Sequence, residues 1–121
     1  MSLDIYLVSE KGRQNVHGYW IDEGEILYTD NITHNIGKMA AEAGVYSFLW
    51  RPDEIDPPVT KANELIEPLS KALIEMIKNR KKYERLNPEN NWGSYDTLVE
   101  FVFRYLQACA DYPNSNIEVS R

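Results

Sequence analysis

The chain has 121 residues, 43% of them hydrophobic and 26% charged, and its 19 acidic and 13 basic side chains give a formal net charge of −6. This composition is typical of a globular domain and lies outside the low-hydrophobicity, high-charge range of disordered chains. The acidic balance argues against binding of nucleic acids or anionic membranes through bulk charge. We expect one domain over 1–121, because a chain of this size buries about two thirds of its unfolded surface.

The first ten residues include Asp4 and only a short apolar run, so they lack the basic start and long apolar centre of a signal peptide. Charged residues interrupt every apolar run before it approaches the roughly 18 residues that a membrane span requires. Cys109 is the only cysteine, which excludes an internal disulfide and indicates a reducing compartment. We therefore expect the cytoplasm of a bacterial cell.

Alternating apolar residues predict a half-buried strand over 3–9. The stretches 16–21 and 25–28 are rich in β-forming residues and are separated by an acidic turn. Near the end of the chain, Ile117 and Val119 alternate with polar residues and predict a last strand beside the first. Together these segments predict a small antiparallel sheet, made of N-terminal hairpin strands and a C-terminal strand.

Three segments have the apolar spacing of helices, so we expect an α+β fold in which the sheet packs on about three helices. The first helix is expected over 32–43 with Asn31 as its N-cap. The second is expected over 60–77, and Pro68 within it predicts either a kink or two helical pieces that meet near Glu67. The third is expected over 94–111.

The third helix has polar residues on only one narrow sector, so we expect it to be central. The positions expected to be buried in it are Leu98, Val99, Val102, Tyr105, Leu106 and Cys109. Residues 45–50 are apolar without a clear period, and 51–59 contain three prolines, which predicts an irregular exposed crossing. Gly44 is expected to end the first helix in the left-handed conformation.

The sequence contains no glycine-rich phosphate loop and no GxSxG, HExxH or CxxC motif. His17 and His34 fall in different predicted elements, so no metal site is expected. Cys109 falls on the buried arc of its helix, which favours a structural thiol over a reactive one. We expect no metal and no cofactor.

The densest polar cluster is formed by Asn31, Thr33, His34 and Asn35, where a strand is expected to end and a helix to begin. Free backbone N–H groups at a helix start favour an anion, and His34 can hold a bound group. In the alternative interpretation, Asn31 and Thr33 only cap the helix and His34 is solvated.

Two further clusters combine aromatic and polar side chains. Trp92 and Ser94 precede the third helix and can form one wall of a pocket, or can simply pack on and cap the helix start. Trp50 and Arg51 can grip an anion, or can hold an irregular loop together. We expect the clusters around His34 and Trp92 to meet at one concave site that His34 faces.

The blocks NITHN at 31–35, LWRP at 49–52 and NWGSY at 91–95 are the strongest part of a resemblance that covers nearly the whole chain. The chain resembles a family of small bacterial and bacteriophage proteins that has no established activity. The resemblance implies a phage or prophage setting. Some members carry extra cysteines in the N-terminal hairpin that suit zinc, but 15–28 has none here, so no metal is carried over.

The leading hypothesis is a non-catalytic binding module for a small polar or anionic ligand or for a protein partner. It rests on the three clusters described above. A hydrolase or transferase with His34 as general base is the second hypothesis, although no nucleophile or orienting carboxylate lies at a diagnostic spacing. A third is a phage-encoded inhibitor that binds a host defence protein through an acidic face.

Overall fold

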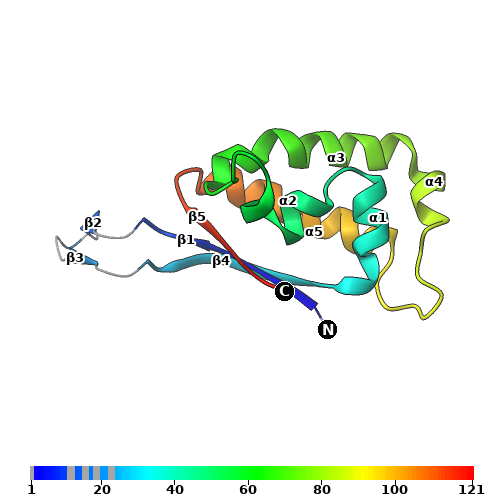
Figure 1. Cartoon of the computed structure of the whole chain (residues 1–121), viewed down its shortest axis with the longest axis horizontal. Coiled ribbons are helices and arrows are strands. Elements are labelled where there is room, and N and C mark those ends of the chain that lie inside the picture. Colours follow the sequence, from blue (N-terminus) through cyan, green and yellow to red (C-terminus); the bar gives the residue numbers. More distant parts are fainter. Residues whose placement is uncertain (1, 11–12, 15–16, 18–19, 22–23) are drawn as a thin grey trace.

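The structure is a computed structural model that describes residues 2–10, 13–14, 17, 20–21 and 24–121. Helices cover one face of a three-stranded antiparallel sheet, which confirms the predicted α+β fold (Figure 1). No helix of the described residues is long and apolar enough to cross a membrane.

The central strand of the sheet is β1 (Ser2–Val8), and it lies between β4 (Ile26–Thr33) and β5 (Asn116–Ser120). Its apolar residues alternate as predicted. The inward side chains, of which Ile5 is one, are fully buried, whereas Asp4 on the opposite face is half-buried. Both neighbours pair antiparallel with β1, so the predicted contact between the first and last strands is confirmed.

β4 is longer than the sequence predicted, and it continues through Thr33. Asn31 pairs with Asp4 within the sheet, so the prediction that Asn31 caps a helix is wrong. The strand continues because Ile32, opposite Leu3, is buried against the helices and the β-branched residues favour extended backbone. The helical cap is Thr33, whose hydroxyl accepts a hydrogen bond from the backbone N–H two residues later.

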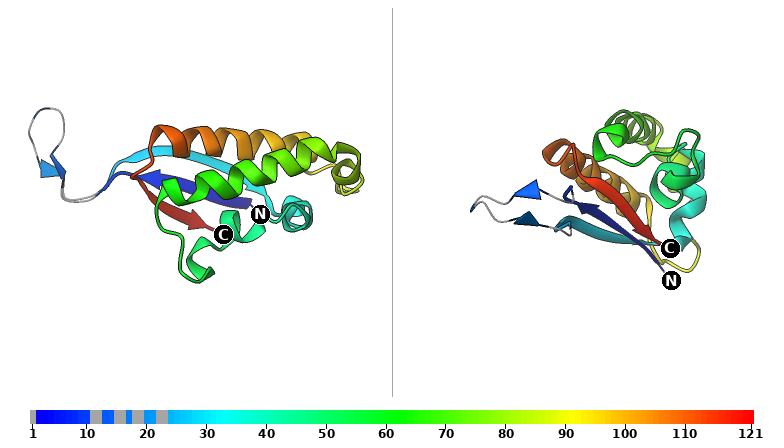
Figure 2. Two further views of the ribbon diagram at one scale, coloured as in Figure 1. Left: turned by 90° about the horizontal axis from the view of Figure 1, so that it is seen from above. Right: turned by 60° about the vertical axis from the view of Figure 1, so that its left-hand side comes forward.

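The hairpin region contains a separate two-stranded sheet of β2 (Arg13–Gln14) and β3 (Trp20–Ile21). This small sheet lies beyond one end of β1 and β4, away from the helices (Figures 1 and 2). The remainder of the strand predicted over 16–21 lies outside the described residues, apart from His17, which is in a turn.

The first predicted helix is divided into a 3₁₀ turn, η1 (His34–Ile36), and α1 (Gly37–Glu42). Gly44 follows with a φ of +76°, which confirms the predicted left-handed end. The next segment was expected to lack a period, but it forms α2 (Tyr46–Trp50), because Val45 and Leu49 lie one turn apart and are both fully buried.

The crossing after α2 is less exposed than predicted. It begins with a 3₁₀ turn, η2 (Pro52–Glu54), and the side chains of both Pro52 and Val59 are buried. The backbone N–H of Val59 donates to the carbonyl oxygen of Pro52 at 3.0 Å, which closes the segment into a loop.

The second predicted helix consists of a 3₁₀ turn, η3 (Ala62–Leu65), followed by α3 (Ile66–Lys78). Pro68 is the third residue of α3, in the first turn, where a missing N–H breaks no hydrogen bond within the helix. The two helical pieces therefore meet before Pro68, and the proline causes no kink within α3. A short helix that was not predicted, α4 (Arg80–Glu84), follows α3.

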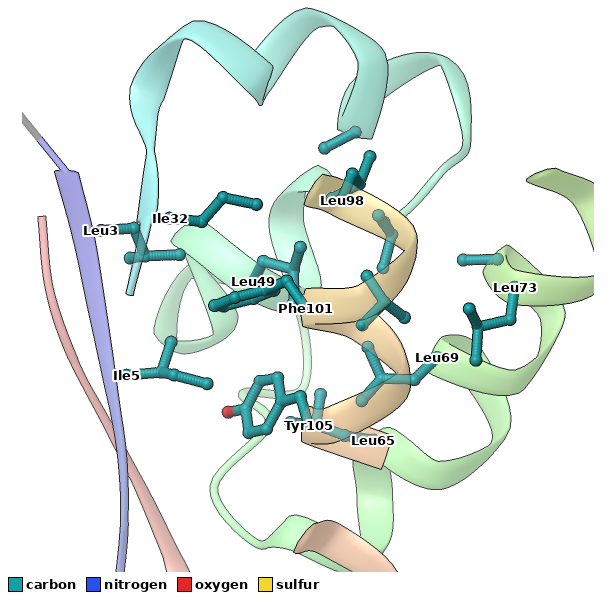
Figure 3. Close-up of a cluster of buried hydrophobic side chains, with 14 of the residues drawn as sticks. Leu3, Ile5, Ile32, Leu49, Leu65, Leu69, Leu73, Leu98, Phe101 and Tyr105 are labelled. Carbon is teal, nitrogen blue, oxygen red and sulfur yellow. The ribbon is translucent and has the colours of Figure 1, made fainter. Parts of the chain in front are cut away.

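The third predicted helix is α5 (Tyr95–Asp111), which packs against both the sheet and α3 (Figures 2 and 3). Its buried face supports the prediction of a central helix, and it contributes Leu98, Phe101, Val102, Tyr105 and Cys109 to the core. Val99 and Leu106, which were also expected to be largely buried, are partly buried and pack against this core. They lie at the edge of the buried arc, and Phe103 beyond them is 58% exposed.

Candidate functional site

The polar cluster at the end of β4 is divided between two faces of the molecule. Asn31 lies opposite Asp4 on the face of the sheet away from the helices, and its side chain is exposed. Thr33 and Asn35 form the cap of η1, in which the Asn35 side-chain amide also donates to the Thr33 hydroxyl at 3.2 Å. Of the four residues of the predicted cluster, Thr33, His34 and Asn35 therefore lie in one turn, and Asn31 lies apart from them on the sheet.

His34 is held by a tryptophan from α2. The indole Nε1–H of Trp50 donates to Nδ1 of His34 at 2.8 Å. Trp50 itself is 2% exposed and stacks on Tyr46, with ring centroids 5.0 Å apart and planes at 10°. Because Nδ1 accepts this hydrogen bond, the neutral imidazole carries its proton on Nε2. His34 therefore presents a hydrogen-bond donor at its other nitrogen.

Arg51 takes part in an ion-pair network that joins α2 to the end of the chain. Its guanidinium donates to Glu54 at 2.7 Å, and this hydrogen bond raises the pKa of Arg51. Arg121 donates to the same carboxylate at 3.2 Å and to Asp53 at 3.1 Å, and this contact lowers the pKa of Asp53. Arg121 also donates to the carbonyl oxygen of Trp50 at 3.0 Å, so Trp50 and Arg51 both have structural partners.

The loop before α5 is organised by side-chain caps. Ser94 accepts from the backbone N–H of Thr97 and donates its own N–H to the Thr97 hydroxyl, which confirms Ser94 as the predicted N-cap. The side chain of Asn87 accepts from the N–H of Tyr95 at 2.8 Å, so a second free donor of the helix start is satisfied. Asn87 was not singled out in the sequence, although an asparagine before a proline is a known turn signal.

Trp92 is the exposed aromatic residue of this loop. Its side chain is 64% exposed, while its backbone N–H donates to the side chain of Asn90 at 3.0 Å. Asn91 has a φ of +60°, a left-handed conformation that asparagine tolerates better than most residues. The backbone that carries the indole is therefore fixed by hydrogen bonds and by a turn.

Gly93 brings this loop against the end of β4. A Cβ at Gly93 would lie 2.8 Å from Cγ2 of Thr33 and 2.9 Å from Cγ1 of Ile36, which is closer than a real Cβ approaches. The loop therefore contacts the turn that contains His34. This contact places the loop that carries Trp92 beside the turn that carries His34, because Trp92 precedes Gly93 and His34 follows Thr33 in the chain. The shared concave site that His34 faces stays a prediction.

Five hollows of the described surface are lined by residues outside the clusters around His34 and Trp92. One, of about 510 Å³, lies beside α3 and is lined in part by Phe48, Glu67 and Lys71. Four others, of about 330 to 470 Å³, are lined by residues outside 31–36 and 90–95. None of these five hollows is lined by a residue of the meeting point, where the sequence suggested a concave site.

The geometry is unfavourable for His34 as a general base. A base needs a free lone pair, but Nδ1 of His34 accepts from Trp50 and Nε2 carries the proton. The third group that orients a catalytic histidine is commonly a carboxylate, and here it is an indole. Among the described residues there is no group of three or more potential metal ligands. Burial raises the pKa of the Cys109 thiol to about 12, so this sulfur is a poor nucleophile.

Comparison with known proteins found no relative: no family model matches the chain, and neither a curated protein nor a solved structure matches it.

Proposed function

We propose that the chain is a non-catalytic binding module for a protein partner. The contact surface is centred on the side chain of Trp92 and includes Thr33, His34 and Asn35 at its margin; we refer to these four residues as the Trp92 surface. The observation that carries the proposal is the 64% exposure of an indole on a loop whose backbone is fixed.

Tryptophan is the residue type most enriched among the side chains that dominate protein interfaces. Leaving an indole in water is unfavourable, and burying it against a partner recovers that apolar area. The hydrogen bonds of Asn87 and Asn90 and the contact of Gly93 hold the loop before any partner arrives. Little conformational entropy is then lost when the surface binds.

Polar groups beside the indole can form hydrogen bonds that make the contact specific. The Nε2–H of His34 is a donor, and the exposed side chain of Asn35 lies next to it in the chain. A partner that presents carbonyl or carboxylate oxygens beside an apolar pocket has the matching chemistry. We favour a protein over a small ligand, because small ligands bind in concave sites and the hollows described above lie elsewhere. The phage or prophage setting stays a prediction.

Site-specific photocrosslinking tests this proposal. A photoreactive phenylalanine analogue replaces Trp92 in one variant and Phe103 in a second, which is a matched control because Phe103 is 58% exposed on another part of the surface. We expect a defined crosslinked protein in cells of the native source from the first variant only. Trp92→Ala should then weaken binding to that protein at least about tenfold, as loss of a central tryptophan commonly does.

Two results would contradict the Trp92 surface. The first is identical crosslinking from both positions, which would indicate random collisions. The second is an unchanged affinity of the Trp92→Ala variant for the captured protein, with Phe103→Ala measured in parallel.

A further inference from the structure

The positive charge of this acidic chain is concentrated at one corner. Among the 11 basic side chains that the structure describes, six form ion pairs: Arg51, Lys61, Lys71, Arg80, Arg104 and Arg121. Of the five described basic side chains without an acidic partner, four lie within eight consecutive residues, namely Lys78, Lys81, Lys82 and Arg85, and the fifth is Lys38. All five are exposed.

The corner forms where α3 ends and α4 begins. Asn79 has non-helical backbone angles (φ −119°, ψ 41°), and its side-chain amide donates to the carbonyl oxygen of Glu75 at 3.0 Å. Arg80, the first residue of α4, pairs with Glu84 at 3.2 Å and lies over the ring of Tyr95. The Tyr83 hydroxyl of α4 donates to Glu75 of α3, and a hollow of about 390 Å³ lined by residues 78–82 lies at the junction of the two helices.

Two isoleucines lie on the solvent side of α3 beside this corner. Ile74 is 56% exposed and Ile77 is 63% exposed, although the residue before each of them, Leu73 and Met76, is buried in the core (Figure 3 shows Leu73). Ile74, Ile77 and Lys78 are three and four residues apart, so they lie on one face of the helix. Exposed apolar side chains thus adjoin cations that have no acidic partner among the described residues, although Lys82 lies over the ring of Tyr83.

We propose that this basic corner, defined as Ile74, Ile77, Lys78, Lys81, Lys82 and Arg85, is a docking surface for an acidic amphipathic helix of a partner protein. The argument is charge complementarity, because carboxylates of the partner would pair with the three lysines and one arginine of the corner that have no acidic partner in the described part of the chain. Its apolar residues would cover the two isoleucines, as amphipathic helices do on helical surfaces. The surface lies outside the residues of the Trp92 surface, so its test is separate.

A protein helix fits this corner better than nucleic acid does. The remaining part of the chain is more acidic than its formal net charge of −6, because the corner holds much of the positive charge. A long polyanion would extend from the corner over acidic surface and be repelled. Exposed isoleucines also contribute nothing to contacts with a phosphate backbone, whereas they add buried apolar area to a helix interface.

The experiment measures fluorescence anisotropy of a labelled synthetic helix of about 20 residues, with leucines on one face and glutamates on the others. We expect it to bind the full chain with an affinity that falls as salt rises. Lys81→Glu should weaken binding about tenfold, and Lys38→Glu, the same charge change at an unpaired lysine on α1, should leave it unchanged. Ile77→Ser should also weaken binding, and Ile26→Ser, at an equally exposed isoleucine of β4, should not.

Four results would overturn the proposal. The first is that the labelled helix does not bind at low salt, and the second is that Lys38→Glu lowers the affinity as much as Lys81→Glu does. The third is equal binding of a peptide of the same composition with its leucines scrambled, which would mean that only bulk charge is recognised. The fourth is tighter binding of a duplex oligonucleotide than of the helix, which would assign the corner to nucleic acid. Circular dichroism of each variant verifies that the effects are not caused by unfolding.

Discussion

Two regions of this molecule are held together in different ways. In the first, which we call the sheet interface, α5 packs on β1 through apolar side chains such as Ile5 and Phe101, both fully buried (Figure 3). In the second, which we call the helical end, α1, α4 and the loop 87–94 lie at one end of the molecule (Figure 1). These short elements are joined by individual polar contacts as well as by buried side chains. Examples are the contact of the Tyr83 hydroxyl with the carbonyl oxygen of Glu42 and the asparagine caps of the loop.

The difference shows which region can carry a binding surface. The sheet interface consists of many buried apolar side chains. Few polar groups there are available to a partner. At the helical end, buried side chains such as Met39 and Tyr83 also belong to the core, and the short elements are joined in addition by single hydrogen bonds. Some side chains beside those bonds, such as that of Trp92, remain exposed. Trp92 and the basic corner both lie at this end or adjoin it, which agrees with the general observation that rigidly positioned loops carry function.

The largest expected effect is at the sheet interface. Phe101→Ala should lower the free energy of unfolding by about 3 to 5 kcal/mol, because it removes a fully buried ring and leaves a cavity. Phe103→Ala, two residues along the same helix, should change it by less than about 0.5 kcal/mol, because that ring is 58% exposed. Urea denaturation of both variants measures the difference. Similar losses would mean that the two faces of α5 are wrongly assigned.

A smaller effect is expected where the loop meets the end of β4. Gly93→Ala should cost about 2 to 3 kcal/mol, because its φ of +89° disfavours a side chain and its Cβ would collide with Thr33 and Ile36. Gly44→Ala is the matched control, since its φ is +76° but no atom lies within 4 Å of the added Cβ. It should cost about 1 kcal/mol, from backbone strain alone.

The difference in the free energy of unfolding between the Gly93→Ala and Gly44→Ala variants measures the contact between the loop and the end of β4. Equal costs for Gly93→Ala and Gly44→Ala would show that the loop does not pack on Thr33. In that case the surface proposed around Trp92 would lose its connection to His34.

The sheet interface could be predicted from the sequence, and the helical end could be predicted only in part. A strand or helix that buries one face repeats its apolar residues at a fixed period, so β1 and α5 were predicted correctly. α2 and α4 have five residues each, which is too short for a period to emerge. β4 was predicted too short because its polar residues on the open face of the sheet look like a cap.

The candidate clusters could be identified from composition, but their internal contacts could not. His34 and Trp50 are 16 residues apart, and nothing in local sequence indicates that an indole donates to this imidazole. The contact of Gly93 with Thr33 joins segments 60 residues apart. Such pairs depend on how the helices pack, which periodicity does not determine.

The smallest expected effects come from two buried tyrosines, one in each region, and they should have opposite signs. Tyr83, at the helical end, donates to Glu75 and lies 3.3 Å from the carbonyl oxygen of Glu42. Tyr105, at the sheet interface, is fully buried, and its hydroxyl makes no hydrogen bond to any of the described residues. Burial raises the pKa of both phenols.

Replacing each tyrosine by phenylalanine removes only the hydroxyl. Tyr83→Phe should lower the free energy of unfolding by about 1 kcal/mol, because Oε2 of Glu75 loses the donated hydrogen bond of the phenol, while Oε1 keeps that of Asn79. Tyr105→Phe should raise it by about 1 kcal/mol, because an unpaired hydroxyl no longer has to be buried. Thermal and urea denaturation of the two variants measure the signs. If Tyr105→Phe were as destabilising as Tyr83→Phe, the Tyr105 hydroxyl would have a partner, and the sheet interface would depend on a polar contact much as the helical end does.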